Sequence, residues 1–380
     1  MSANHIGGDA STAIPGVRKR ILLGHLGSFG DCLYTTAIAR QIKHDLPASH
    51  LTWAIGSMYR SVIDLNPHVD EVWEIPVSGV GEAIHVWPEF ERQVAARKAR
   101  GDFDLVYLTQ SLPSNIRNYD GTIRSSIFRN YPGRITVPVT PVVRLSESEV
   151  ERVRVFAEAH RLRERQGVIL FECVPRSGQS AATLEFALGI AHSLVRSVDN
   201  VSVILSSHVT FHSDNDRIID GSVLSFRENA ELSKYCTLLV GSSSGVTWLC
   251  TSDWAKPLPM IQMIKPDAFC FASVVYDHQY FGLPYDSIIE LRDDEPGRLL
   301  PCVLKVIAGD FTGARREFHR EMRMSYRHYE NTQRTYLQHG RLVEAVRFFY
   351  FHVRRHGFRL RFLFWPFYRL FKKLRAFRET

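Results

Sequence analysis

The sequence has 380 residues, more than one hydrophobic core usually serves, so we expect two domains of ordinary size. A composition of 45% hydrophobic and 23% charged residues is typical of a globular protein, and no stretch approaches the ~20 apolar residues of a membrane span, which excludes a membrane-spanning chain. The net charge of +7 is uneven, because residues 341–380 carry eleven Lys or Arg against two Glu, whereas residues 1–340 are slightly acidic.

The cysteines, the histidines and the N-terminus limit the kind of protein further. Six cysteines lie in apolar surroundings without a CxxC motif, which predicts reduced, buried thiols in a cytosolic protein. There is no HxH or HExxH pattern, so we predict no metal site. No cofactor is expected either. Residues 1–19 lack the apolar run of a secretory signal and are expected to be a flexible leader.

From residue 20 onward, strand-like apolar runs alternate with helix-like patterns, as in parallel α/β proteins. In the first half, a helical pattern follows each of the first three strands, the second of them at 59–66. The expected strands are 20–26, 50–56, 70–77 and 103–111. The alternation predicts a Rossmann-like domain over residues 20–145.

A proline-containing stretch then separates two halves of similar size. Ser146 and Glu149 form a capping-box sequence, which predicts a helix from there to about residue 164. The alternation resumes, with strands expected at 167–174, 201–208, 237–241 and 257–264, and helices at 183–198, 229–236 and 246–255. We therefore predict a second Rossmann-like domain over 146–310, facing the first across a cleft, and a helical segment over 311–380.

A glycine-rich loop follows the first strand and ends at Asp31, where a helix is expected to begin. Its glycine spacing fits neither a dinucleotide fingerprint nor a P-loop. Ligands bind at the carboxyl ends of strands in open α/β sheets, so the loop is a candidate ligand-binding loop. Judged by residue type alone, Asp31 is better explained as a helix cap than as a catalyst. The candidate binding residues of this loop are His25, Gly27, Ser28, Phe29 and Gly30.

Three further loops follow strands of the second half. The turn GSSSGVT offers hydroxyls and backbone N–H groups to a phosphate, although a serine cap on an ordinary helix is the alternative. The loop RSGQ could hold a diphosphate or be a plain turn, and the loop after residue 206 is a weaker signal. The candidate phosphate-binding residues are Arg176, Ser177, Gly178, Gln179, Ser206, Ser243, Ser244, Gly245 and Thr247.

Residues 341–380 interleave twelve aromatic residues with their eleven bases. Past Pro366, apolar and basic residues occupy different faces of a predicted amphipathic helix, which favours an anionic membrane surface. A helix packed on the protein and a nucleic-acid surface are the alternatives, and lipid fits the long apolar face better than nucleic acid does. The residues expected at the membrane are Phe367, Arg369, Leu370, Phe371, Lys372, Lys373 and Leu374.

With these segments in order, the chain resembles glycosyltransferase family 9, the bacterial heptosyltransferase-like enzymes of lipopolysaccharide assembly. The likeness is carried by LGSFGDCLYTTAIARQIKHDLPASHLTWAIG, LNPHVDEVWEIP, DFDLVYLTQ and LLVGSSSGVTWLCTSDWAKPLPMI. The resemblance implies a GT-B fold and an inverting, metal-independent transfer from a nucleotide sugar to an acceptor. It implies that the candidate residues of the first loop face the acceptor and that the phosphate-binding candidates of the second half bind the sugar donor. It also makes Asp31, at the end of the first glycine loop, the expected catalytic base, and so reverses the preference for a simple cap.

The departures from the family pattern concern the donor. Where the family has Asp-Ser/Thr-Gly-x-x-His, this chain has Ser243 to Trp248, so ADP-heptose is not carried over. The expected acceptor is a lipopolysaccharide or another cell-surface glycan, at the cytoplasmic face of the plasma membrane. A further likeness to autotransporter heptosyltransferases leaves a protein acceptor open. A nucleotide-sugar epimerase of the same fold and a non-catalytic protein that binds sugar nucleotides or glycans remain alternatives.

Overall fold

The computed structural model describes residues 18–111, 115–175 and 178–358, and its first half forms a four-stranded parallel sheet. The strand order is β3-β2-β1-β4. Its strands are β1 (Arg20–Gly24), β2 (His50–Gly56), β3 (Glu71–Ile75) and β4 (Leu105–Leu108), and its helices are α1 (Phe29–Asp45), α2 (Val80–Ala99) and α3 (Arg124–Arg129). Every residue of β2 after His50 is buried, as expected for a parallel sheet covered on both faces.

The second half forms a six-stranded parallel sheet in the order β10-β9-β8-β5-β6-β7. Its strands are β5 (Gly167–Glu172), β6 (Val201–Ser206), β7 (Ile218–Asp220), β8 (Leu238–Gly241), β9 (Met260–Ile264) and β10 (Ile288–Arg292). Its helices are α5 (Leu184–Ser197), α6 (Glu228–Leu232), α7 (Gly245–Leu249), α8 (Val274–Phe281) and α9 (Leu299–Ile307). The predicted α/β architecture with two parallel sheets is confirmed.

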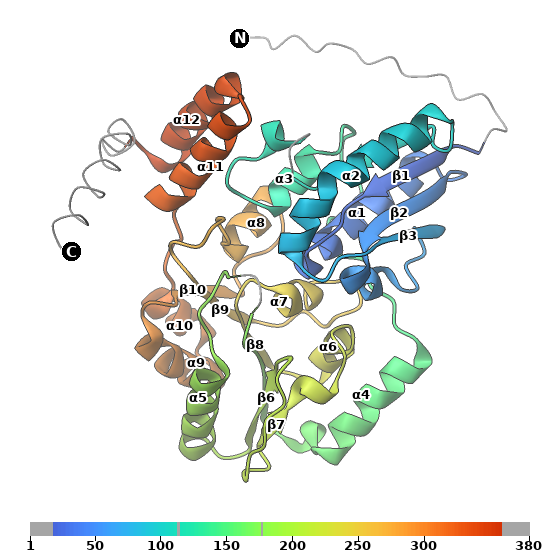
Figure 1. Cartoon of the computed structure of the whole chain (residues 1–380). Helices are drawn as coiled ribbons and strands as arrows, with labels where there is room; N and C mark the ends of the chain where they lie inside the picture. The colour runs from blue at the N-terminus through green and yellow to red at the C-terminus, as the bar shows by residue number, and fades with distance from the viewer. Residues whose placement is uncertain (1–17, 112–114, 176–177, 359–380) are drawn as a thin grey trace, which may run out of the picture.

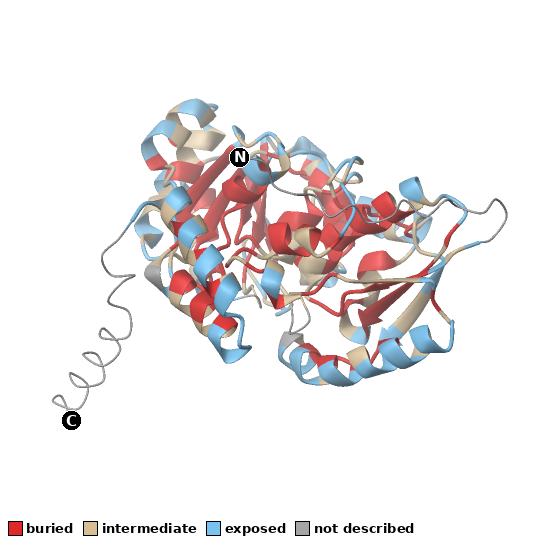
Figure 2. Cartoon of the chain, turned by 90° about the horizontal axis from the view of Figure 1, so that it is seen from above, coloured by how far each residue is buried: buried red, intermediate tan, exposed pale blue. Residues whose placement is uncertain are grey.

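The two sheets belong to two bodies that meet through α1 and α7, which pack against each other (Figure 1). Buried residues fill the two sheets and the helix faces that cover them, and exposed residues lie on the outer helices (Figure 2). All six cysteines lie in the described part of the chain, where they are buried and unpaired. Each body therefore has a core of closely packed apolar side chains, to which free cysteines contribute.

The predicted helix boundaries hold only in part. Ser146 and Glu149 form the expected capping box, and α4 (Glu147–Ala159) ends earlier than predicted. The helix expected at 59–66 is a 3₁₀ helix. The helix expected at 246–255 ends as α7 at Leu249, because Asp253 is held by the chain between the domains: its N–H donates to the Pro141 carbonyl at 3.0 Å, and its carboxylate accepts the Val143 N–H at 3.1 Å.

The C-terminal part continues as three helices, α10 (Phe311–Phe318), α11 (Tyr326–Gln338) and α12 (Leu342–His356). Figure 1 shows α11 and α12 as a hairpin at the edge of the molecule. The residues predicted at the membrane, from Phe367 to Leu374, lie outside the described residues. Within the described part, no helix combines the length and the apolar character needed to cross a bilayer.

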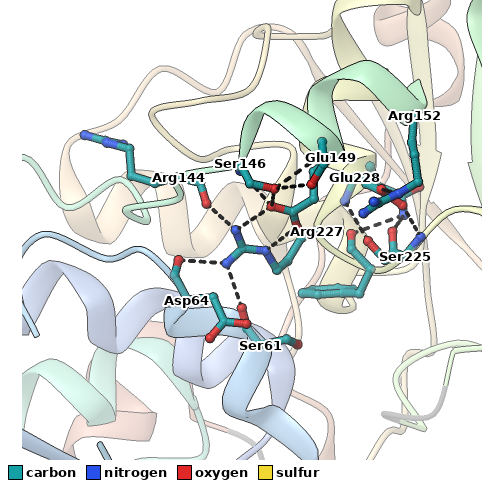
Figure 3. Close-up of polar contacts among 12 residues, drawn as sticks. Ser61, Asp64, Arg144, Ser146, Glu149, Arg152, Ser225, Arg227 and Glu228 are labelled. Atoms are coloured by element: carbon teal, nitrogen blue, oxygen red, sulfur yellow. Dashed lines mark hydrogen bonds and ion pairs between the residues drawn. The ribbon is translucent and has the colours of Figure 1, made fainter. Parts of the chain in front are cut away.

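Arg227 fastens the second body to the first (Figure 3). Its buried guanidinium donates to the main-chain carbonyls of Ser61 and Asp64, at 2.9 and 2.7 Å, and to that of Arg144. It also pairs with both carboxylate oxygens of Glu149, at 2.8 and 3.1 Å. One side chain thus connects the segment before α6, the first body and α4.

Arg227→Ala is expected to lower the free energy of unfolding by about 3–5 kcal/mol, because it leaves a carboxylate and several carbonyls without their donor. Urea denaturation measures the loss. Arg154→Ala, on the exposed side of α4, is the control: its pairs with Glu151 and Glu158 are in water, and the expected loss is below about 1 kcal/mol. Equal losses in the two variants would contradict the special role of Arg227.

Candidate functional site

A cavity of about 480 Å³ lies at the carboxyl ends of strands from both sheets. In the second sheet, the strands that follow β5 are added first on one side of it, as β6 and β7, and then on the other side, as β8 to β10. In the first sheet, β2 and β3 lie on one side of β1, and β4 lies on the other. Such switch points are where open α/β sheets bind ligands. The first body contributes Ser28, Phe29, Gly30, Met58, Tyr59 and Arg124.

The second body contributes the larger share of the lining, from the ends of three strands and the segment before α6. These residues are Glu172, Cys173, Val174, Pro175, Gln179, Ser206, Ser207, His208, Ser222, Leu224, Phe226, Asn229, Ser243, Ser244, Gly245 and Val246. Phe29 and Phe226 meet across the two bodies with ring centroids 4.5 Å apart. The cavity is therefore shared by both bodies and contains both apolar and polar groups.

Asp31 is the third residue of α1 and is half-buried beside this cavity. Its Oδ2 accepts the backbone N–H of Ser28 at 3.4 Å and the Ser28 hydroxyl at 3.1 Å. Ser28, Phe29 and Gly30 line the cavity, whereas the Asp31 side chain is not among the lining groups. Burial raises the pKa of Asp31, although the charge of Arg124 and the Ser28 donors act in the opposite direction. A carboxylate with a raised pKa is a better proton acceptor than an ordinary aspartate.

Two other candidates of the first loop do not reach the cavity. His25 is buried, and its Nδ1 lies 2.9 Å from the Thr109 hydroxyl. Burial lowers the pKa of His25 to about 3, so it stays neutral. A Cβ at Gly27 would lie 2.3 Å from the ring of Tyr59, which lines the cavity. His25 therefore has a structural role under the loop, through its contact with Thr109. The absence of a side chain at Gly27 lets the Tyr59 ring pack close to the loop and line the cavity.

The serine-rich turn after β8 also has residues that line the cavity and one that does not. Ser243, Ser244 and Gly245 line the cavity, whereas Thr247 is buried behind them, its hydroxyl 2.7 Å from a carboxylate oxygen of Glu172. A Cβ at Gly245 would lie 2.9 Å from the ring of Phe226, so only glycine fits there without movement. The structure brings three of the four predicted residues of this turn to the cavity.

Glu172, the last residue of β5, is a site residue that was not predicted from the sequence. Its buried carboxylate accepts the N–H of Ser242 at 3.0 Å, the N–H of Val246 at 2.8 Å and the Thr247 hydroxyl. It therefore occupies donors at the start of α7 that were predicted to bind a phosphate. The sequence does contain a signal for it, because an acid at the end of an otherwise apolar buried strand needs a specific partner.

Arg124, in α3, was also missed, and it is the one Lys or Arg among the described residues lining the cavity. Its Nη1 lies 3.2 Å from the Asp277 carboxylate, its Nη2 donates to the Ser243 carbonyl at 3.1 Å, and the guanidinium lies 4.2 Å from the Trp248 ring centroid. Its Nε has no hydrogen-bond partner among the described residues. Burial raises the pKa of Asp277 to about 7, with Arg124 opposing the shift.

The remaining donor candidates lie on the loops after β5 and β6. Gln179 lines the cavity, and its buried Oε1 has no partner within the described residues. Ser206 lines it as well and donates to Asn229 Oδ1 at 2.9 Å. Gly178 is exposed and does not line it, and Arg176 and Ser177 lie outside the described residues. In the described ranges, no group of three or more His, Cys, Asp or Glu could hold a metal ion.

Searches of protein-family models and of curated proteins returned no match. Among solved structures, the chain is similar to a glycosyl transferase family 9 protein from Veillonella parvula, with 15% identity, a TM-score of 0.51, and coverage of 72% of this chain and 87% of the other. A second match is E. coli ADP-heptose LPS heptosyltransferase II, with 14% identity, a TM-score of 0.47, and coverage of 77% of this chain and 99% of the other. A third is a putative UDP-N-acetylglucosamine 2-epimerase from Listeria monocytogenes, with 9% identity, a TM-score of 0.46, and coverage of 85% of this chain and 96% of the other.

At these identities the likeness concerns the fold. The Veillonella structure has the highest TM-score of the three and covers most of both chains, and this chain has the two parallel α/β sheets described above. The prediction of a GT-B fold, made from the sequence, is therefore confirmed: the chain is a divergent protein with the fold of glycosyltransferase family 9.

Proposed function

We propose that this chain is an inverting glycosyltransferase that moves a sugar from a nucleotide-sugar donor to a hydroxyl of an acceptor. Fold alone does not assign a reaction, because one fold supports many. The observation that carries the proposal is the shared cavity, whose first-body wall ends beside a half-buried carboxylate, Asp31, with a raised pKa. The wall opposite is built from strand ends of the second body.

Asp31 is the proposed general base. The acceptor oxygen attacks the anomeric carbon and forms the new glycosidic bond, while the bond from that carbon to the donor phosphate oxygen breaks. The acceptor proton passes to the Asp31 carboxylate, and the bonding electrons leave with the nucleoside diphosphate. One displacement from the opposite side inverts the configuration. The two hydrogen bonds from Ser28 hold the carboxylate in one orientation for this role.

The proposed donor site differs from the one that the sequence suggested. Glu172 already holds the Val246 N–H and the Thr247 hydroxyl, so the phosphates are better served by other groups. Arg124 lines the cavity and offers the positive charge. Gln179, Ser206 and Ser244 add polar atoms around it. Fixed charges and dipoles of this kind stabilise a leaving phosphate without a metal.

The acceptor and the place of the reaction are proposed from the C-terminal segment. Its bases and aromatic residues suit the anionic, cytoplasmic face of the plasma membrane, where lipid-linked acceptors lie. We therefore propose a lipopolysaccharide or another cell-surface glycan as the acceptor and a peripheral membrane location. Nucleic acid is not a proposed partner. Tests with glycolipid acceptors and with acceptor proteins distinguish the proposed acceptor from a protein side chain.

A screen of nucleotide sugars tests the proposed donor. The full chain in EDTA is expected to gain thermal stability with one of them, because a ligand that binds only the folded state raises the unfolding temperature. The same donor is then expected to lose its sugar to a glycan acceptor at a rate that Mg²⁺ does not change. Differential scanning fluorimetry and product analysis by mass spectrometry measure the two results.

Three outcomes would contradict the proposal in different ways. Binding or transfer that requires a divalent cation would overturn metal independence. Conversion of the donor sugar to its epimer without an acceptor would assign an epimerase instead. Tight donor binding with no transfer to any glycan or protein acceptor would leave a binding protein.

A further inference from the structure

The inner face of α12, the last described helix, packs against α11. Ala345, Phe348 and His352 are buried on this face. Phe348 stacks on Tyr329 of α11 with ring centroids 5.5 Å apart, and lies 6.0 Å from Tyr336. These contacts form a small apolar core between α11 and α12. The hairpin is thereby held together from within, and its outer side is left to solvent.

The outer face of α12 is apolar. Its large apolar side chains are between 61% and 69% exposed: Leu342, Val343, Val346 and Tyr350. At about 100° per residue, these four positions fall within one arc of about 100° on the helix. Exposed apolar residues are ordinary when single, but four on one arc within nine positions form a continuous stripe. The stripe therefore lies exposed to solvent on the described hairpin.

Positive charge lies directly beside this stripe. Arg347 and Arg354 are exposed and follow at the edge of the same arc. The single acid of the helix, Glu344, lies about 100° beyond the stripe. An apolar sector bordered by arginine and free of acids is the pattern of helices that lie in the interface of an anionic bilayer. Fifteen residues, about 22 Å of helix, are too short to cross one.

We propose that the outer face of α12 docks the protein on an anionic phospholipid surface, with the helix lying in the membrane plane. The apolar stripe enters the boundary between headgroups and acyl chains, and Arg347 and Arg354 pair with headgroup phosphates. This surface lies on the hairpin, apart from the cavity, and does not depend on the proposed reaction. It is also distinct from residues 359–380, because it is built on a helix that α11 holds in place.

Vesicle binding of the full chain tests the docking face. Val346→Ser/Tyr350→Ser is expected to weaken binding to phosphatidylcholine vesicles containing phosphatidylglycerol about tenfold or more. Arg347→Gln/Arg354→Gln is expected to weaken it by a similar factor on these vesicles, without an effect on pure phosphatidylcholine. Val155→Ser, at an exposed apolar residue of α4, is the matched control and should bind as the parent does. All these positions face solvent, so thermal unfolding should be unchanged.

A polarity-sensitive fluorophore on Val346→Cys reports directly where the membrane touches. The expected result is a blue shift on adding anionic vesicles, and no shift for the same probe on Val155→Cys. Vesicle binding without a shift at position 346 would assign docking to residues 359–380 alone and overturn the proposal. A shift that depends on protein concentration without vesicles would assign the face to a second copy. Absence of vesicle binding would overturn it as well.

Discussion

Asp31→Asn is expected to reduce the rate of sugar transfer by about 10²–10⁴-fold while leaving donor binding nearly unchanged. Asparagine has the shape of aspartate, and its Oδ1 can still accept the Ser28 N–H, so the start of α1 should keep its geometry. What it lacks is a carboxylate to take the acceptor proton. Steady-state transfer and calorimetric titration with the donor measure the two effects separately. A variant with normal turnover would remove Asp31 as the base.

The pH profile gives a second measurement of the same assignment. A general base works when ionised, so transfer should decline as the pH falls through the pKa of Asp31, and burial raises that pKa above the ordinary aspartate range. Asp31→Asn should lose this acid limb. Ser28→Ala is the control: it removes one donor to the carboxylate, so the pKa should rise further and the limb should move to higher pH. A limb at the same pH in Ser28→Ala would place the titrating group elsewhere.

The fold could be predicted because its signals are local. Strands buried on both faces appear as continuous apolar runs, as in the RILLG of β1 and the GVILFE of β5. The capping box at Ser146 lies within four residues of chain, and the structure has both of its hydrogen bonds. The end of α7 was not predictable in this way. Asp253 lies outside the helix because it is hydrogen-bonded to Pro141 and Val143, more than 100 residues earlier in the chain.

The site could be predicted only in part, because its polar groups are satisfied across long distances in the sequence. The turn after β8 was placed at the cavity, but nothing within that turn shows that Glu172, 74 positions before Val246, takes its N–H. Arg124 meets Asp277 across 153 positions. Loop composition indicates which groups are available for a ligand. Which of them remain available depends on the other segments that fold against the loop.

Arg124→Gln is expected to lower the rate of transfer by about 10²–10³-fold, since it removes the cation proposed to face the leaving phosphate. It should also move the acid limb to higher pH, because the charge of Arg124 lowers the pKa of Asp31. The variant leaves Asp277 buried without its cation, so a loss of stability is expected too. The rate alone therefore cannot separate catalysis from folding.

Asp277→Asn supplies the matched variant. It removes the negative partner and keeps the guanidinium, which retains the Ser243 carbonyl and the Trp248 ring. If Arg124 faces the leaving phosphate, Asp277→Asn should keep most of the activity, and Arg124→Gln/Asp277→Asn should recover stability in urea denaturation but not the rate. If Arg124 acts only as half of an ion pair between the two bodies, the double variant should recover both. The double variant restores a neutral buried pair, so any loss of rate that remains in it is due to the missing positive charge and not to lost stability.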